Sequence, residues 1–172
     1  EGFPANLDVT VTYILTDRNE LEIHYKAVPD ADTIINMTNH AYFNLGTTAN
    51  GNVLDHELQL FCDHYTPTDA DSIPTGEIRS VEGTAFDFRV PKKIGKDIAA
   101  DDEQLIMCRG YDHNFCVNGE IGKLRPVAKV KDEKSGRKLE VYSDLPGVQL
   151  YTGNFIDGTE TGKDGIVLNQ HY

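Results

Sequence analysis

One histidine stands among side chains that suit a small hydroxylated molecule. His40 is flanked by Asn39, Tyr42, Phe43 and Asn44. An imidazole exchanges a proton near neutral pH and can act as a general acid or base. Amides pair with hydroxyl groups, and aromatic rings offer a flat apolar surface to C–H groups. The segment therefore suits proton transfer on a sugar, while a histidine at the end of a strand also occurs without any function.

Two more polar residues are candidates for binding hydroxyl groups. Asp112 lies in the polar segment 109–115, between two apolar runs. An aspartate beside glycine and asparagine is also a common turn former. Gln149 alternates with Val148 and Leu150, which places it on the opposite face of an expected strand. It could equally be a solvated strand residue.

Other catalytic patterns are missing from the sequence. There is no His-x-His pair, and His56 and His64 have no third metal ligand beside them, so a surface or core role fits them better. Phosphate-binding loops and nucleophile elbows are also absent. The cysteines, which have neither metal-ligand spacing nor an even number, are Cys62, Cys108 and Cys116. We expect a site without a metal ion.

Charge and composition limit the classes of molecule that this protein is expected to bind. The formal net charge is −12, which repels nucleic acid and anionic membranes and does not favour a phosphorylated substrate. The basic residues form no patch interleaved with aromatic residues. We see neither a membrane span nor a signal peptide, and the cysteine pattern fits a reducing compartment. These features predict a cytoplasmic protein that handles a neutral small molecule.

The elements that must position these residues are mainly strands. Residues 7–15 and 21–27 alternate in polarity around a turn, which predicts a hairpin, and Thr33–Asn39 is expected to be a strand leading into His40. Residues 94–107 have weak helical character. The remaining expected strands are Val53–His64, Ile78–Val81, Phe86–Phe88, Leu124–Lys131, Lys138–Ser143, Val148–Asn154 and Ile166–Leu168. The pattern predicts an all-β fold, an antiparallel β-sandwich, in a single domain over residues 1–172.

An ordered series of motifs covers essentially the whole chain. It consists of Glu1–Pro4, Asn39–Leu45, Tyr65–Pro67, Ile73–Gly76, Phe86–Arg89, Gly110–Phe115 and Pro146–Asn154. Together these segments resemble the ordered motifs of the galactose mutarotase (aldose 1-epimerase) family. It implies a large, many-stranded antiparallel sandwich. It also implies interconversion, without a cofactor, of the α and β anomers of free aldohexoses such as galactose and glucose. By the same resemblance, His40 is the general acid, and Asp112 and Gln149 bind sugar hydroxyls, with Asn39 as a further substrate-binding candidate.

Two departures from the family pattern bear on activity. The family's general base is a glutamate near the C-terminus. The matching position here is Asn169 when the motif is aligned from its left end and Leu168 when it is aligned from its right end, and neither side chain takes up a proton at neutral pH. The family's N-terminal portion, with a substrate-binding arginine and a further histidine, is absent before Glu1. We therefore expect a partial chain with little or no activity alone, and exposed strand edges that promote self-association; the oligomeric state is left open. The alternatives are a non-catalytic carbohydrate-binding module and, less favoured by the acidic charge, a phosphosugar epimerase.

Overall fold

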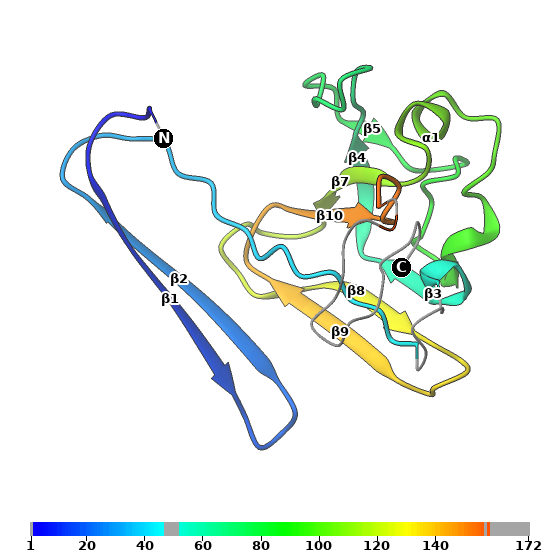
Figure 1. Ribbon diagram of the computed structural model, residues 1–172, viewed down its shortest axis with the longest axis horizontal. Helices are drawn as coiled ribbons and strands as arrows, with labels where there is room; N and C mark the ends of the chain where they lie inside the picture. Colours follow the sequence, from blue (N-terminus) through cyan, green and yellow to red (C-terminus); the bar gives the residue numbers. More distant parts are fainter. Residues whose placement is uncertain (1, 47–51, 157, 159–172) are drawn as a thin grey trace. The chain divides into compact units, whose positions relative to one another are not determined.

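The computed structural model describes residues 2–46, 52–156 and 158, and most of its regular structure is strand (Figure 1). The chain divides into two compact units, Glu1–Tyr42 and Phe43–Tyr172. Among the described residues, no helix is long and apolar enough to cross a membrane. The sheets are antiparallel throughout, as the sequence predicts.

The first unit is built on a long hairpin of β1 (Leu7–Leu15) and β2 (Leu21–Pro29), which confirms the first predicted hairpin (Figure 1). In its turn, the Thr16 hydroxyl accepts hydrogen bonds from the backbone N–H groups of Arg18 and Glu20. Asn19 takes the left-handed conformation that asparagine tolerates better than most residues, with φ of 62°. Sequence polarity and turn chemistry therefore agree in this hairpin.

The predicted strand Thr33–Asn39 is wrong. Residues 33–46 carry no helix or strand, and no backbone hydrogen bond joins residues 33–39 to another described part of the chain. A strand requires a neighbour that takes its backbone hydrogen bonds, and alternation alone cannot supply one. The end of this segment is held differently, since the carbonyl of Leu45 accepts from Ser135 Oγ at 2.8 Å and that of Gly46 from Arg137 Nη1 at 3.1 Å.

The second unit contains two four-stranded sheets, in the orders β10-β7-β4-β5 and β6-β3-β8-β9. Their strands are β3 (Glu57–Leu60), β4 (Cys62–Thr66), β5 (Arg79–Ser80), β6 (Lys92–Lys93), β7 (Asp112–Val117), β8 (Arg125–Lys131), β9 (Lys138–Ser143) and β10 (Gly147–Tyr151). Both sheets contribute to one buried core, Leu60 and Val127 from one and Tyr65 and Phe115 from the other. The predicted second hairpin is confirmed as β8 and β9, and the expected strand Val148–Asn154 as β10. The expected strand Ile166–Leu168 lies outside the described residues.

The predicted strand Val53–His64 is divided by a corner between the two sheets. It begins with a short 3-10 helix, η1 (Val53–Asp55), and continues as β3 and then β4. At the corner, Phe61 N–H donates to Val127 O of one sheet, and Phe61 O accepts from Asn118 N–H beside the other. The chain thus pairs on both sides of one residue, and period-two alternation continues through the change of sheet.

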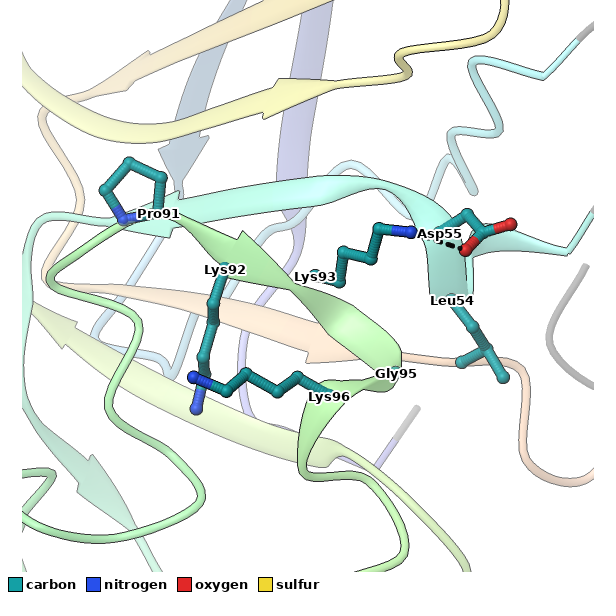
Figure 2. A pocket seen from close by; sticks show the side chains of 7 residues that line it. All are labelled: Leu54, Asp55, Pro91, Lys92, Lys93, Gly95 and Lys96. Atoms are coloured by element: carbon teal, nitrogen blue, oxygen red, sulfur yellow. Dashed lines mark hydrogen bonds and ion pairs between the residues drawn. The ribbon is translucent and has the colours of Figure 1, made fainter.

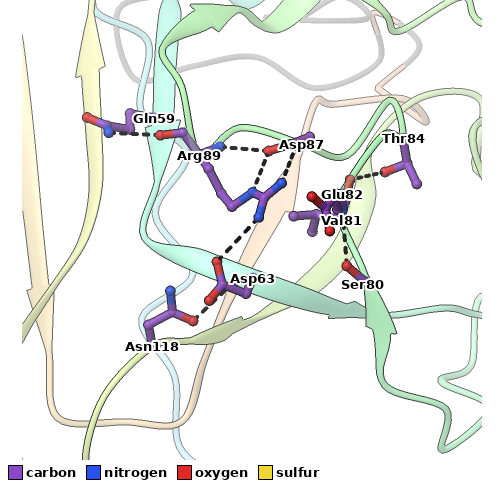
Figure 3. Close-up of polar contacts among 9 residues, drawn as sticks. All are labelled: Gln59, Asp63, Ser80, Val81, Glu82, Thr84, Asp87, Arg89 and Asn118. Carbon is purple, nitrogen blue, oxygen red and sulfur yellow. Dashed lines mark hydrogen bonds and ion pairs between the residues drawn. The ribbon is translucent and has the colours of Figure 1, made fainter.

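The predicted strand Phe86–Phe88 is a turn whose aromatic rings are wholly buried. Phe86 stacks on Tyr65 at a ring separation of 4.2 Å, and the carbonyl of Phe88 accepts from the Leu60 N–H of β3 at 2.9 Å, so ring packing and one backbone hydrogen bond hold this segment. Between the two rings in sequence, the Asp87 carboxylate accepts two hydrogen bonds from the Arg89 guanidinium, at 2.9 and 2.8 Å, which lower the pKa of that carboxyl (Figure 3). The motif Phe86–Arg89 therefore has a structural role.

The remaining predicted elements are shorter than expected, and two strands, β6 and β7, were not predicted. Ile78–Val81 shortens to β5, and the weakly helical stretch 94–107 forms the 3-10 helix η2 (Ile94–Lys96) and α1 (Glu103–Cys108). The longer of the two is β7, which lies between β10 and β4 in its sheet. Its inward-facing His113 is fully buried. A polar residue at a core position hid the apolar alternation of this strand.

Candidate active site

The outward face of β7 and β10 brings two of the predicted binding residues together. Asp112 lies opposite Tyr151, and Asn114 lies opposite Gln149. Alternate residues of a strand share a face, so Asp112, Asn114, Gln149 and Tyr151 all project to the side away from buried His113 and Phe115. We call these four residues the polar shelf.

Asp112 and Gln149 are in direct contact on the polar shelf. Gln149 Nε2 donates to Asp112 Oδ1 at 2.8 Å. The two side chains come from residues diagonal to each other across the strand pair, a spacing that long side chains can bridge. Asp112 is partly buried and Gln149 is exposed. A carboxylate has several acceptor positions and an amide both donors and acceptors, so the pair is equipped to bind neighbouring hydroxyl groups.

Asn114 is held over a glycine on the same face. Asn114 pairs with Thr66 of β4 on one side and with Gln149 on the other. A Cβ atom at Gly147 would overlap Asn114 Oδ1, so the absence of a side chain at Gly147 makes room for this amide. Sequence reasoning missed Asn114 as part of the site. The available signal was its place two residues after Asp112, on the same face of a strand.

The loop before Asp112 is fixed by a buried polar network. Helix α1 is followed by its capping residue Arg109, whose backbone is left-handed, and Gly110 comes next with φ of 138°. Asn154 Nδ2 donates to the carbonyls of Cys108 at 2.8 Å and Tyr111 at 2.9 Å. Tyr111 N–H donates to Thr152 Oγ at 3.1 Å. These contacts determine where β7 begins, and therefore where the Asp112 carboxylate stands.

The other predicted site residues lie in the first unit or outside the described residues. His40 is exposed, with its ring edge-on to that of Tyr42 at 5.2 Å. Asn39 Nδ2 donates to Tyr13 Oη at 3.3 Å, and Asn39 Oδ1 accepts from Ala41 N–H. The structure thus groups His40 with Asn39 in one unit and Asp112 with Gln149 in the other. Asn169 lies outside the described residues.

A separate hollow of about 530 Å³ contains none of the predicted site residues (Figure 2). It is lined by Leu54, Asp55, Pro91, Lys92, Lys93, Gly95 and Lys96. Lys93 pairs with Asp55 at 3.1 Å and Lys92 with Asp97 at 2.6 Å, so these cations already have carboxylate partners. His56 is buried and His64 exposed, and in the part of the chain that the structure describes no cluster of three or more metal-ligating residues occurs.

The comparisons with known proteins agree with the motif pattern. The family model described as aldose 1-epimerase matches residues 1–172. The chain belongs to the aldose 1-epimerase family. It is 48% identical to galactose mutarotase of Homo sapiens over 99% of this chain and 48% of that protein. It is 42% identical to aldose 1-epimerase of Escherichia coli (strain K12), over 92% of this chain and 45% of that protein.

The family's solved structures share the fold. A galactose 1-epimerase from Lactobacillus acidophilus superposes with a TM-score of 0.84 at 36% identity, over 98% of this chain and 47% of that one. An aldose epimerase homologue from C. elegans gives the same score at 31% identity, over 99% and 49%. This chain spans about half the length of the curated relatives it matches. The expected galactose mutarotase-like, all-β fold is confirmed.

Proposed function

We propose that the protein interconverts the α and β anomers of free aldohexoses such as galactose and glucose. The observation that carries the proposal is the hydrogen-bonded Asp112–Gln149 pair on the polar shelf of an aldose 1-epimerase family member. The acidic net charge of −12 favours a neutral sugar over nucleic acid, an anionic membrane or a phosphosugar. The described thiols are unpaired, which supports a reducing, cytoplasmic setting.

Anomer exchange requires two proton carriers and a means of holding the sugar. A general acid protonates the ring oxygen while a base removes the proton of the C1 hydroxyl, which opens the ring to the aldehyde. Rotation about C1–C2 and closure in the reverse sense give the other anomer. We assign the acid role to His40 and hydroxyl binding to Asn39, Asp112 and Gln149. An amide cannot act as the base, so Asn169 does not fill that role, and another group must supply it.

The test is the polarimetric rate of α-D-galactose mutarotation with the whole natural polypeptide that carries these residues. We expect a rate well above that of buffer, and a large fall in His40→Ala. Lys138→Ala, on an exposed strand residue away from the polar shelf, serves as the control and should keep the full rate. A buffer rate with retained galactose binding would instead indicate a non-catalytic carbohydrate-binding protein.

A further inference from the structure

The residue after Asp112 is a histidine at the centre of the core. His113 has no exposed surface, and its ring lies edge-on to Phe86 at 4.8 Å and to Tyr65 at 5.8 Å. Burial lowers the pKa of His113 to about 4, so its imidazole is neutral near pH 7. A neutral imidazole carries one N–H, and the neighbouring groups determine which nitrogen holds it.

The hydrogen bonds around His113 select one tautomer. Asp112 N–H donates to His113 Nδ1 at 3.1 Å, so Nδ1 carries no hydrogen. The hydrogen is therefore on Nε2, which lies 3.2 Å from Gln104 Oε1. Cys108 Sγ lies 3.8 Å from the same nitrogen. The ring thus accepts from the backbone of Asp112 and donates to the side chain of Gln104.

Gln104 is itself fixed, so the ring has a rigid support. Gln104 Oε1 accepts from Thr68 N–H at 2.7 Å, and Gln104 Nε2 donates to Thr68 O at 3.0 Å. These two bonds of opposite sense define which end of the amide faces His113. Gln104 also lies in the first turn of α1, where Asp102 Oδ1 accepts from its N–H. All three side chains, Gln104, Thr68 and His113, are buried.

Asp112 needs this support because it lies beyond the paired part of the neighbouring strand. On the β4 side, the pairing of β7 ends at Thr66 with Asn114. Asp112 N–H donates to the imidazole rather than to a strand carbonyl. A buried backbone donor without an acceptor is costly, so the ring also stabilises this end of the strand.

We propose that His113 is a positioning residue for the sugar site. As the Nε2–H tautomer it fixes the backbone of Asp112, and thereby directs the Asp112 carboxylate towards Gln149. Its effect on catalysis rests on the proposed function of the Asp112–Gln149 pair, while its effect on the geometry of that pair does not. A purely structural core residue would stabilise the fold without controlling that pair.

The geometry can be tested by NMR without any sugar, in the whole natural polypeptide. In the wild type, we expect an unprotonated Nδ1 and a protonated Nε2 at His113, with a Gln149 side-chain amide protected from hydrogen exchange. His113→Phe keeps an aromatic ring but removes the acceptor, and the Gln149 amide should lose its protection. His113→Asn places Oδ1 at the position of Nδ1 and should restore it. A protonated Nδ1 in the wild type, or unchanged Gln149 protection in His113→Phe, would overturn the proposal.

The catalytic consequence is a change in KM rather than in kcat. We expect His113→Phe to raise the KM for galactose about 10-fold with kcat within about 2-fold, the pattern of lost uniform binding, and His113→Asn to recover most of it. Val81→Ala, at an equally buried core position, controls for general destabilisation and should leave KM unchanged. An equal rise in KM for Val81→Ala would show that His113 acts only through the stability of the core and does not position Asp112. If the wild type itself does not act on galactose, the proposed function fails, and the NMR result still decides the positioning role.

Discussion

The segment around His40 and the strand that begins at Asp112 differ in how their functional side chains are held. His40 is exposed on a stretch without helix or strand, and the centre of its ring lies 5.2 Å from that of Tyr42. Asp112 begins a strand within a sheet and is bonded to Gln149 through its side chain and to His113 through its backbone. The difference suits the proposed roles, because binding a sugar in one orientation needs fixed acceptors close to their final geometry.

The roles of the two regions are best distinguished by measuring kcat and KM for variants of each. Replacing His40 by Gln removes the proposed acid but keeps a polar side chain, and we expect kcat to fall about 100-fold or more with little change in stability. Asp112→Asn keeps the shape but removes the charge, and should act mainly on KM. Both are measured by polarimetry over a range of galactose concentrations. Equal effects on KM and kcat in the two variants would contradict the division of roles.

The pH dependence of stability should trace to the strand region. The pKa of His113 is about 4 in the folded protein and about 6.5 when unfolded, so between these values the unfolded state binds more protons. Stability therefore rises with pH across this window, and the folded state loses about 3 kcal/mol from this group as pH falls from 7 to 4. Urea unfolding at both pH values checks this. In His113→Asn the loss of stability between pH 7 and pH 4 should be smaller. Every carboxylate is kept in this variant, so the change reports the imidazole alone.

Gly110→Ala should destabilise the fold by displacing the loop between α1 and β7. At φ of 138°, the added Cβ would meet Asn154 Oδ1 and, at 2.9 Å, Thr152 Oγ. We expect a loss of about 2–3 kcal/mol, from backbone strain together with the disturbed buried hydrogen bonds. Gly122→Ala is the matched control, because Gly122 also has positive φ, 83°, but open space around it. A loss of equal size in both variants, measured by urea unfolding, would show that backbone strain alone is responsible.

The smallest effect is expected for Gly147→Ala, which disturbs the polar shelf directly. The new methyl group would displace the Asn114 amide, and we expect the KM for galactose to rise a few-fold, about 1 kcal/mol of lost binding. Asn114→Ala combined with Gly147→Ala removes the overlap. If the double variant binds galactose more weakly than Gly147→Ala alone, the amide of Asn114 itself contributes to galactose binding.

How far the sequence predicts this structure depends on the kind of pattern at each position. Alternation in residues 7–15 and 21–27 gave the hairpin correctly, because both strands and their turn carry consistent signals. The same rule failed for Thr33–Asn39, since alternation does not say whether a partner strand exists. It also failed at Phe61, where the chain changes sheets without a break in period.

The candidate site shows the same limit. The family motifs identified Asp112 and Gln149 by type, but their mutual hydrogen bond depends on the register of β7 and β10, which no local pattern contains. Asn114 and His113 were missed because a polar residue was expected to mark a turn or a solvated surface. Here one polar side chain supports the site from beneath while its neighbours form the outer face.

The alternation along β7 also constrains how this segment can change in length. Asp112 faces outwards and His113 inwards, so deleting one residue within 109–111 would exchange their faces if β7 slipped by one residue in register to make up the lost length. A carboxylate would then enter the aromatic core, and the imidazole would occupy the outer face. A substitution in this region can alter either the supporting residue His113 or the candidate site residue Asp112. An insertion or deletion that shifts the register changes both at once. The number of residues between α1 and β7 is therefore as much a part of the site as the residues on its surface.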